Sequence, residues 1–312
     1  MKMKMEKSQR IRTFKRQLPL HGFVFAGLIF LLLFSLIPMA GVIIAFEDYD
    51  IKAGLTGIFT SQFVGLKHFK AFLTDRKFPI LMRNTLCISV LKLIFSFPLP
   101  IIFAIMISEM GGKVYKRVVQ TVSYLPHFFS WIIVSGILFT FFSTNTGVVN
   151  EVLLKLGAID KPIPILMDPK YYYGLAVFSE IWKETGWGAI IYLAAIAGIS
   201  PTLYESARID GAGRMQCIRH ITLPSIKGTV AILLILAIGG LFGSNFDQAM
   251  LLGNTMNLSR SEILEVFIYK IGLGQGRYSF AAAAGLFQSV ISFILVLSAN
   301  AVSKKVSGSS LF

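Results

Sequence analysis

Long apolar segments recur along this chain and constrain its fold more than any other feature. The first of them, residues 22–46, contains no Asp, Glu, Lys or Arg. About 20 apolar residues in a helix cross the roughly 30 Å hydrocarbon core of a bilayer, where a helix satisfies its own backbone hydrogen bonds. The five further segments of similar character are residues 81–108, 118–142, 171–199, 228–246 and 278–303. We therefore predict an all-α polytopic membrane protein with six transmembrane helices.

The overall composition leaves little room for a soluble domain. Only 15% of the residues are charged and 54% are hydrophobic, whereas roughly 25% of a typical soluble domain is charged. The 312 residues could form two soluble domains by length alone, but the six segments leave no stretch free for one. Cys87 and Cys217 are too few for a disulfide framework or a zinc site. We expect both to be small packing residues.

The net charge of +14 is best explained by membrane topology. Six spans place both termini on one side of the membrane. With the termini inside, the inner segments hold 16 Lys and Arg against 4 Asp and Glu, whereas the outer segments hold 11 against 10. This asymmetry follows the positive-inside rule and predicts an N-in, C-in orientation. No basic run is interleaved with stacking aromatics, so we expect no nucleic-acid partner.

The basic start of the chain, followed by an apolar run, resembles a signal peptide. The run of 25 residues exceeds the usual roughly 7–15, and no small-residue cleavage site follows it, so we expect a retained first helix. Farther along, residues 65–69 are predicted to begin a short helix lying on the membrane. Three prolines within residues 145–170 are expected to prevent a continuous helix there.

Signatures of catalysis are missing from the sequence. It has no Gly-x-x-x-x-Gly-Lys-Ser/Thr phosphate loop and no His-Glu-x-x-His pair. The four histidines are too dispersed to predict a metal site. Gly272-x-Gly274-x-Gly276 lacks the preceding strand of a dinucleotide loop, and we interpret it as a turn. We therefore predict that the chain is not an enzyme.

A polar stretch, residues 200–224, lies on the predicted inner face between the fourth and fifth spans. Ser200 and Pro201 are typical of a helix start, with a capping side chain before a proline at the first helical position. Thr202 and Glu205 match the spacing of a capping box. One interpretation of Glu205 is therefore a capping carboxylate in an ordinary amphipathic connector.

Two glycines divide this stretch into two short helices. Gly211 and Gly213 are expected to end the first helix, and a second helix then carries apolar residues at helical spacing between Met215 and Ile221. We predict that Pro224 stops the second helix, because proline lacks a backbone donor. The small residues around Gly211 would let the backbone of a partner approach closely.

The same residues resemble the cytoplasmic loop of ABC-importer permeases. That loop reads Glu-Ala-Ala, three residues, Gly, nine residues, Ile-x-Leu-Pro. The corresponding residues here are Glu205-Ser206-Ala207, Gly211 and Ile221-x-Leu223-Pro224. Ser206 departs from the usual alanine but is still small. The motif is specific when it precedes the penultimate span on the inner face, as it does here.

A second set of residues resembles the oligosaccharide branch of type I importers. Within that branch, the resemblance is greatest to permeases that are paired with a lipoprotein sugar receptor. These residues are Asn84-Thr85, Asn245-Phe246-Asp247-Gln248, Tyr269–Leu273, Tyr278–Ala281 and Gly285–Ser289. The resemblance covers residues 80–303, most of the chain.

The resemblance implies a type I ABC-importer transmembrane fold in a prokaryotic cell membrane. The implied parts are a basic cytoplasmic arm (1–21), a first helix with its outer loop (22–79), a permease core of five helices (80–303) and a cytoplasmic tail (304–312). Coupling helices near residues 200–224 would seat in a cleft of a separate ATPase. The residues implied to couple to that ATPase are Glu205, Ser206, Ala207, Asp210, Gly211, Ile221, Leu223 and Pro224.

The implied function is to form half of a path that imports oligosaccharides or polysaccharide fragments, opened by closure of the ATPase. The implied partners are a second homologous permease in a heterodimer, a cytoplasmic ABC ATPase dimer and an extracytoplasmic sugar-binding protein or lipoprotein. The chain itself is implied to hold no cofactor, since ATP and Mg would be bound by the ATPase.

The sequence identifies the residues of the substrate path less clearly than those of the coupling loop. Charged residues within spans usually face a bundle interior or an aqueous cavity. Glu180, Lys183 and Glu184, however, could simply neutralise one another on one helix face. His127 and Trp131, one helical turn apart, are interpreted as core packing.

The candidates for lining the path are polar or aromatic residues of the later spans. They are Glu184, Trp187, Asn245, Asp247, Gln248 and Gln288. An alternative is that Trp187 and Trp182 anchor the protein at the membrane interface. The polar residues between 245 and 248 could likewise only cap the outer end of a helix.

Two alternative functions belong to other classes. An ion-gradient-driven secondary sugar transporter predicts inverted repeats with helices interrupted at matching points, and the sequence shows neither. A membrane-embedded enzyme needs a clustered nucleophile or metal site inside the spans, which the sequence also lacks.

Overall fold

The structure, a computed structural model, describes residues 17–18, 20–243 and 245–307. Within them, four helices are by themselves long and apolar enough to cross a membrane, and two bent helix pairs bring the number to six. The four are Leu20–Phe46, Phe78–Glu109, Arg214–Gly239 and Tyr278–Lys305; the pairs are Lys113–Phe128 with Trp131–Phe142 and Pro169–Ala197 with Pro201–Ile209. Most of the predicted basic arm and of the tail lies outside the described residues.

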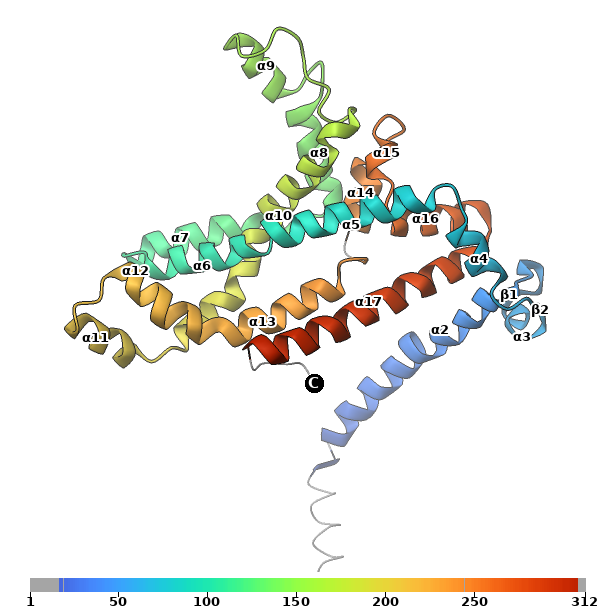
Figure 1. Ribbon diagram of the computed structural model, residues 1–312, viewed down its shortest axis with the longest axis horizontal. Helices are drawn as coiled ribbons and strands as arrows, with labels where there is room; N and C mark the ends of the chain where they lie inside the picture. Colours follow the sequence, from blue (N-terminus) through green and yellow to red (C-terminus); the bar gives the residue numbers. More distant parts are fainter. Residues whose placement is uncertain (1–16, 19, 244, 308–312) are drawn as a thin grey trace, which may run out of the picture.

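The first span stands apart from the other helices (Figure 1). Its side chains are largely exposed, including Phe23 at 80%, as expected of a helix surrounded by lipid. The span contains a π-helical turn η1 (Leu32–Leu36), α2 (Ile37–Met39) and a 3-10 helix η2 (Ala40–Phe46). Its last turns pack against α4 (Lys67–Leu73) and α17 (Tyr278–Ser307).

A small hairpin follows the first span at the outer end of the molecule (Figure 1). It comprises β1 (Glu47–Asp48), η3 (Ile51–Thr56), α3 (Gly57–Thr60) and β2 (Gln62–Phe63). The helix predicted to begin within residues 65–69 is present as α4. The hydrogen bond from Lys67 to Asp48, at 2.5 Å, holds the pKa of this carboxyl below its ordinary value.

The second and third spans are each divided into shorter helical elements. The second consists of α5 (Phe78–Phe95) and α6 (Pro98–Glu109); the third consists of α7 (Lys113–Tyr124), η4 (Leu125–Phe128) and α8 (Trp131–Phe142). The third span bends by 100°, so residues 118–142 do not form the single helix that their apolarity suggested. Phe129 and Ser130 are extended, and the Ser130 hydroxyl accepts a hydrogen bond from the Ile133 N–H, which starts a new helix.

The fourth span is the longest regular helix before the last span. After the short α9 (Val148–Lys155), the proline-containing segment is irregular, as predicted, until Pro169 opens α10 (Pro169–Ala197). The buried Asn150 amide ties this outer segment together by donating to three backbone carbonyls, including that of Ile163 at 2.9 Å.

The fifth span begins earlier and ends earlier than predicted. After α11 (Pro201–Ile209), a continuous run of α12 (Arg214–Cys217), the π-helical turn η5 (Ile218–Thr222) and α13 (Leu223–Gly239) forms one span. The prediction that Pro224 stops the second short helix is wrong. In the wider turn η5, the Leu223 N–H donates to Ile218 O. This shifts the hydrogen-bond register at the point where Pro224 lacks a donor, so the helix continues.

The segment after the fifth span folds back on the outer half of the bundle before α17. Its elements are α14 (Phe246–Leu252), α15 (Leu258–Ser261), α16 (Leu264–Tyr269) and η6 (Lys270–Gly274). One buried cluster joins α14 and α16 to α8 and α10, and another joins α16 to α5 and α17. Cys217 is buried, Cys87 is half-buried, and both are free thiols, as expected.

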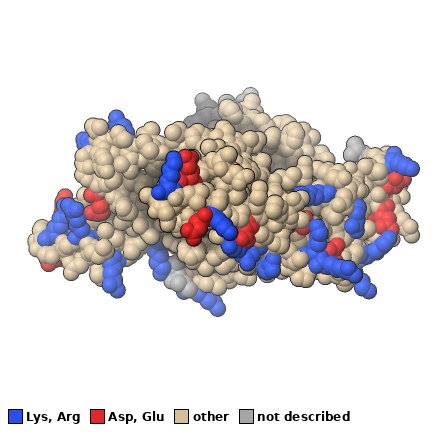
Figure 2. Space-filling model, turned by 90° about the horizontal axis from the view of Figure 1, so that it is seen from above, with Lys and Arg blue, Asp and Glu red and all other residues tan. Residues whose placement is uncertain are grey.

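Charged side chains are unevenly distributed over the surface. On the face shown in Figure 2, Lys and Arg lie at both ends, in a central group with Asp and Glu and along the lower edge of the view, whereas much of the upper part is uncharged. The uncharged surface suits contact with lipid, because a charged group in hydrocarbon is costly.

Candidate functional site

The two short helices α11 and α12 meet at a sharp turn at one end of the molecule (Figure 1). Gly211 lies at the turn with φ +82°, a conformation that residues with a side chain rarely adopt. The turn is closed by the Ala212 N–H donating to Ala207 O at 2.8 Å and the Asp210 N–H donating to Ser206 O at 3.0 Å. The predicted pair of helices broken by glycine is therefore present.

Glu205 lies exposed on α11 and is not a capping residue. Within the described chain its carboxylate has no hydrogen-bond or ion-pair partner, and the predicted capping box is wrong. The Ser200 hydroxyl makes no cap bond either, because it hydrogen-bonds to the Thr202 hydroxyl at 2.8 Å. The Ser206 hydroxyl donates to Thr202 O at 3.0 Å. The carboxylate of Glu205 is therefore free to meet a partner.

Apolar side chains surround this free carboxylate. Ile209 is 86% exposed and Met215 is 73% exposed, which is unusual for large apolar side chains that are not in lipid. A hollow of about 260 Å³ lies between α11 and the following helix, lined by Ala207, Asp210 and Ile221 among others. We call the exposed face of α11 and α12 around this hollow the coupling surface.

The coupling surface is joined to the membrane bundle through the start of the fifth span. The Tyr204 hydroxyl of α11 hydrogen-bonds to the buried Thr222 hydroxyl at 2.9 Å. Leu223 and Pro224 lie within the helix that runs on as α13. α11 is therefore connected to the start of the fifth span through Thr222, and α12 is continuous with that span.

A second candidate site is a cavity of about 420 Å³ bounded by α5, α6, α10 and α13. Most of its wall is apolar, with a few polar and aromatic groups. These are Ser89, Lys92, Ser96, Phe97, Glu180, Glu184, Thr185, Trp187 and Tyr192. We call it the central cavity.

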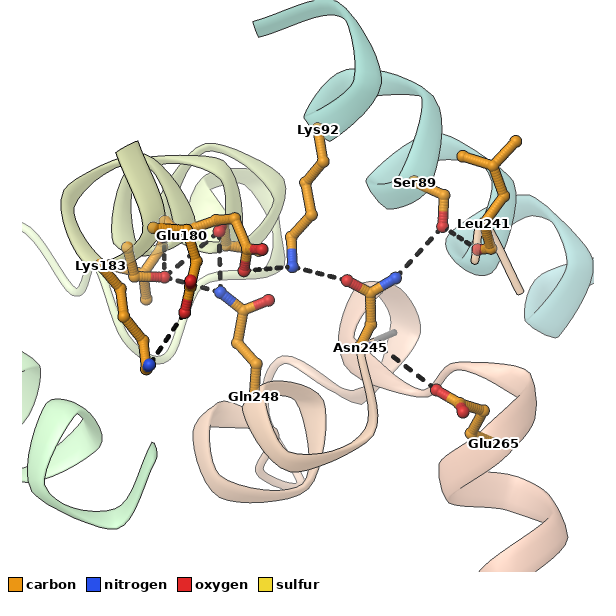
Figure 3. A network of polar contacts seen from close by, with 12 residues as sticks. Ser89, Lys92, Glu180, Lys183, Leu241, Asn245, Gln248 and Glu265 are labelled. Atoms are coloured by element: carbon orange, nitrogen blue, oxygen red, sulfur yellow. Dashed lines mark hydrogen bonds and ion pairs between the residues drawn. The ribbon is translucent and has the colours of Figure 1, made fainter. Parts of the chain in front are cut away.

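Lys92 joins three elements at the outer end of the central cavity (Figure 3). Its ammonium donates to Glu180 Oε2 of α10 at 2.9 Å and to Asn245 Oδ1, just before α14, at 2.5 Å. Asn245 in turn donates to the Ser89 hydroxyl at 3.1 Å, and Ser89 donates to Leu241 O. Because Lys92 and Asn245 are buried, this bridge satisfies groups that would be costly alone.

Glu184 belongs to a separate cluster at the bend of the third span. Its carboxylate meets His127 Nδ1 at 2.7 Å and Lys183 Nζ at 2.8 Å, and Lys183 also donates to His127 O at 2.8 Å. The His127 ring stacks on Trp187, with centroids 4.4 Å apart and planes within 1° of parallel. Glu180 is thus not neutralised by Lys183. Of the two residues expected to pack in the core, Trp131 does so and His127 does not.

The other path candidates lie away from the cavity wall. Gln248 is buried and donates to Ala176 O and to the Ser179 hydroxyl, so it fastens α14 to α10. Asp247 is exposed, and Gln288 donates from α17 to Phe242 O at 2.7 Å. Of the six candidates, Glu184 and Trp187 line the central cavity, whereas Asn245 forms part of the bridge behind it.

Two hydroxyls in the cavity wall lack a hydrogen-bond partner among the described residues. The oxygens of Ser96 and Thr185 are both buried from solvent and unpaired. Buried polar groups are almost always hydrogen-bonded in proteins, so unpaired ones lining a hollow indicate a site for polar ligand groups or water.

Sequence reasoning missed the bridge formed by Lys92 and the unpaired hydroxyls of Ser96 and Thr185. The lysine is visible in the sequence as a charge interrupting the second span, and such a charge requires a partner. The partner, Glu180, lies 88 residues farther along the chain. No local pattern identifies it.

Replacing His127 by alanine is expected to free the Trp187 ring, because the stack and the ion pair that fixes the imidazole are both lost. In a background with Trp131→Phe and Trp182→Phe, acrylamide quenching of the remaining tryptophan should increase at least about twofold. His68→Ala, at the outer hairpin, is the control. Equal quenching in His127→Ala and its parent would show that the imidazole does not hold this ring.

Comparison with known proteins identifies the family of this chain. Residues 96–308 match the binding-protein-dependent transport system inner membrane component family. The chain belongs to this family. The match includes the coupling surface and most of the central cavity.

Individual relatives align over nearly the whole chain. The chain is 42% identical over 298 residues to Protein LplB of Bacillus subtilis (strain 168), covering 96% of this chain and 92% of that protein. It is 40% identical over 286 residues to the polygalacturonan/rhamnogalacturonan transport system permease protein YteP of the same organism, covering 92% and 88%.

A solved structure agrees with the fold. A chain from the crystal structure of a bacterial ABC transporter involved in the import of the acidic polysaccharide alginate superposes with a TM-score of 0.87 and 37% identity, covering 96% of this chain and 99% of that one. The present chain is therefore a multi-pass permease subunit of the inner membrane with the type I ABC-importer fold, as predicted. It is not an enzyme, and ATP hydrolysis belongs to a separate subunit.

Proposed function

We propose that this permease forms half of a path for oligosaccharides or polysaccharide fragments, driven by ATP hydrolysis in partner subunits. The observation that carries the proposal is the central cavity, whose wall combines an indole face with carboxylates and unpaired hydroxyls. Hydroxyl-rich ligands need such groups. The names of the relatives, one for polygalacturonan/rhamnogalacturonan and one for alginate, support a saccharide.

In the proposed path, Trp187 offers a ring face to the sugar, and Ser96, Thr185 and Glu184 offer hydrogen bonds to its hydroxyls. Trp187 is 42% exposed, so part of its ring is accessible. Asp247 and Gln288 are proposed to act nearer the outer half of the path, and Asn245 and Gln248 to position the α14 segment beside it.

The coupling surface is proposed to seat on the ATPase. Glu205 would pair with a basic group of the ATPase cleft, while Ser206, Ala207 and Gly211 allow close approach. Ile221, Leu223 and Pro224 then carry the movement into α13, and Asp210 faces the hollow between the helices. ATP and Mg²⁺ would be held by the ATPase dimer, and this chain would hold no cofactor.

The remaining partners complete the proposed importer. A second homologous permease would supply the other wall of the path, since the central cavity is open on one side. An extracytoplasmic sugar-binding protein or lipoprotein would deliver the substrate. The related alginate transporter, with 37% identity and a TM-score of 0.86, was crystallised in complex with an alginate pentasaccharide-bound periplasmic protein.

The test is the effect of Glu205→Ala and Gly211→Pro on the purified importer. The first removes the free carboxylate, and the second imposes a φ near −65° where the chain has +82°. We expect each to lower substrate-stimulated ATPase activity and uptake at least about tenfold. Glu109→Ala, an exposed carboxylate at the end of α6, is the control.

Two outcomes would contradict the proposal. Full ATPase stimulation and retained ATPase subunits in both variants would show that this surface does not couple. Uptake that persists without ATP but stops when the ion gradient is dissipated would indicate a secondary transporter instead.

A further inference from the structure

A second hollow lies on the other side of α5 from the central cavity. Its volume is about 500 Å³, and it runs along the α5–α6 junction and the outer half of α10. Helical residues are about 100° apart in angle, so Leu91 and Ile94 in this hollow point away from Ser89 and Ser96 in the central cavity. We call it the lateral groove.

The lateral groove is lined by large apolar side chains that remain accessible. Ile94 is 56% exposed, Phe95 52% and Phe178 53%. Because the groove opens away from the proposed substrate path, it faces the side of the permease that lipid can reach.

Two guanidinium groups stand at one end of the lateral groove, beside Tyr173. Arg260 lies over the Tyr173 ring, with Cζ 5.3 Å from the centroid, and this tyrosine lines the groove. Arg83 donates to Asn84 Oδ1 at 3.2 Å, the same oxygen to which the Tyr173 hydroxyl donates at 2.7 Å. Arg83 also donates to Ser259 O at 2.7 Å.

Neither guanidinium has a carboxylate partner within 4.0 Å among the described residues. Both guanidiniums donate hydrogen bonds to neutral oxygens; Asp168, which interacts with the charge of Arg260, is itself paired with Lys170 at 3.2 Å. Arg83 is exposed. The groove therefore ends in a net positive charge, because Arg83, Arg260 and Lys170 outnumber the one carboxylate beside them, Asp168.

Arg83 and Tyr173 lie at the depth of the lipid headgroups on the outer side of the cell membrane. Arg83 is five residues into α5 and Tyr173 four residues into α10, which is about 6–8 Å from the outer ends of these helices. Tyrosine and arginine are typical of this depth, where an apolar body meets lipid headgroups.

We propose that the lateral groove binds an anionic phospholipid of the outer leaflet. One acyl chain lies against Ile94, Phe95 and Phe178, and the headgroup phosphate accepts hydrogen bonds from Arg83 and Arg260. Guanidinium groups bind phosphate in a planar, two-pronged geometry, which makes such pairs stronger than neutral contacts. The lipid fills the space between α5 and α10, the two helices joined by Lys92 and Glu180.

The experiment measures lipid retained by the purified importer. The complex is delipidated, incubated with phosphatidylglycerol or phosphatidylcholine, and examined by native mass spectrometry. Arg83→Gln with Arg260→Gln removes the charge. Gly174→Leu fills the groove, and a Cβ at Gly174 meets no atom within 4 Å, so the helix tolerates it.

The controls are Arg76→Gln, an exposed cation near the outer end of α5, and Gly136→Leu, a second helical glycine with open space around it. We expect the parent and the controls to retain phosphatidylglycerol over phosphatidylcholine. The double arginine variant should lose that preference, and Gly174→Leu should lower phosphatidylglycerol retention at least about fivefold.

Each other outcome overturns the proposal. An unchanged preference in the double arginine variant would show that the guanidiniums do not hold the headgroup. Equal retention of both lipids by the parent would indicate unspecific surrounding lipid. Loss of the second permease from the Gly174→Leu complex, with lipid retention unchanged, would assign the groove to the partner permease. None of these readouts depends on the transported substrate, so they are independent of the proposed function.

Discussion

Replacing Gly186 by alanine is expected to disrupt the contact between α10 and α7 and, with it, uptake. A Cβ at this position would lie 1.9 Å from Ser123 O and 2.4 Å from Ser123 C. Both are backbone atoms, so no side-chain rotation relieves the clash, and the two helices must separate. Overpacking of this kind costs about 1–3 kcal/mol or more. Thermal unfolding of the purified complex, together with uptake, measures the loss.

Two other glycines of α10 provide a graded control. A Cβ at Gly188 would meet the Pro100 ring at 3.1 Å, a contact that a small shift can relieve, and a Cβ at Gly174 would meet nothing within 4 Å. The loss of stability should therefore be large for Gly186→Ala, small for Gly188→Ala and absent for Gly174→Ala. Equal stability of all three variants would contradict the described packing of α7 on α10.

The apolar segments were sufficient to predict the spans, because a bilayer requires length and apolarity of any helix that crosses it. They were not sufficient to predict the shape of the third span. The 100° bend depends on the extended backbone at Phe129 and Ser130, and neither residue is a strong helix breaker. The bend is stabilised by contacts with α10, such as Lys183 to His127 O, that lie 56 residues away in sequence.

The glycine turn in residues 200–224 could be predicted because its cause is local. Glycine's lack of a side chain allows the positive φ of Gly211, and the turn there separates α11 from α12. The course of the chain after Thr222 was not readable. Proline usually ends a helix, and only the π-helical turn η5 explains why this one does not.

The partners of the polar residues in the spans could not be predicted from neighbouring sequence positions. Glu180, Lys183 and Glu184 were expected to neutralise one another on one face of α10; Lys183 does pair with Glu184, but Glu180 is bonded to another helix. Glu180 meets Lys92 from α5. A buried charge takes the partner that the tertiary packing brings to it, and that partner depends on how α5 crosses α10.

Replacing Lys92 by methionine is expected to destabilise the permease by about 3–5 kcal/mol, because it leaves the Glu180 carboxylate without its buried partner. Asn245 Oδ1 also loses its donor. Lys155→Met is the control, since Lys155 and Glu151 form an exposed pair within α9 whose loss costs at most about 0.5 kcal/mol. Chemical unfolding of the purified permease in detergent gives both values.

The double variant Lys92→Met with Glu180→Gln distinguishes loss of stability caused by the unpaired carboxylate from loss caused by altered packing. If the carboxylate is the group left unsatisfied, neutralising it restores much of the lost stability, and the two changes are strongly non-additive. Additive losses would mean that Lys92 acts through its apolar stem or through Asn245 alone. Uptake by the double variant then tests the bridge itself. It joins α5 and α10 to the segment before α14 at the outer end of the central cavity, so uptake should fall if the bridge is needed to keep the cavity wall in place.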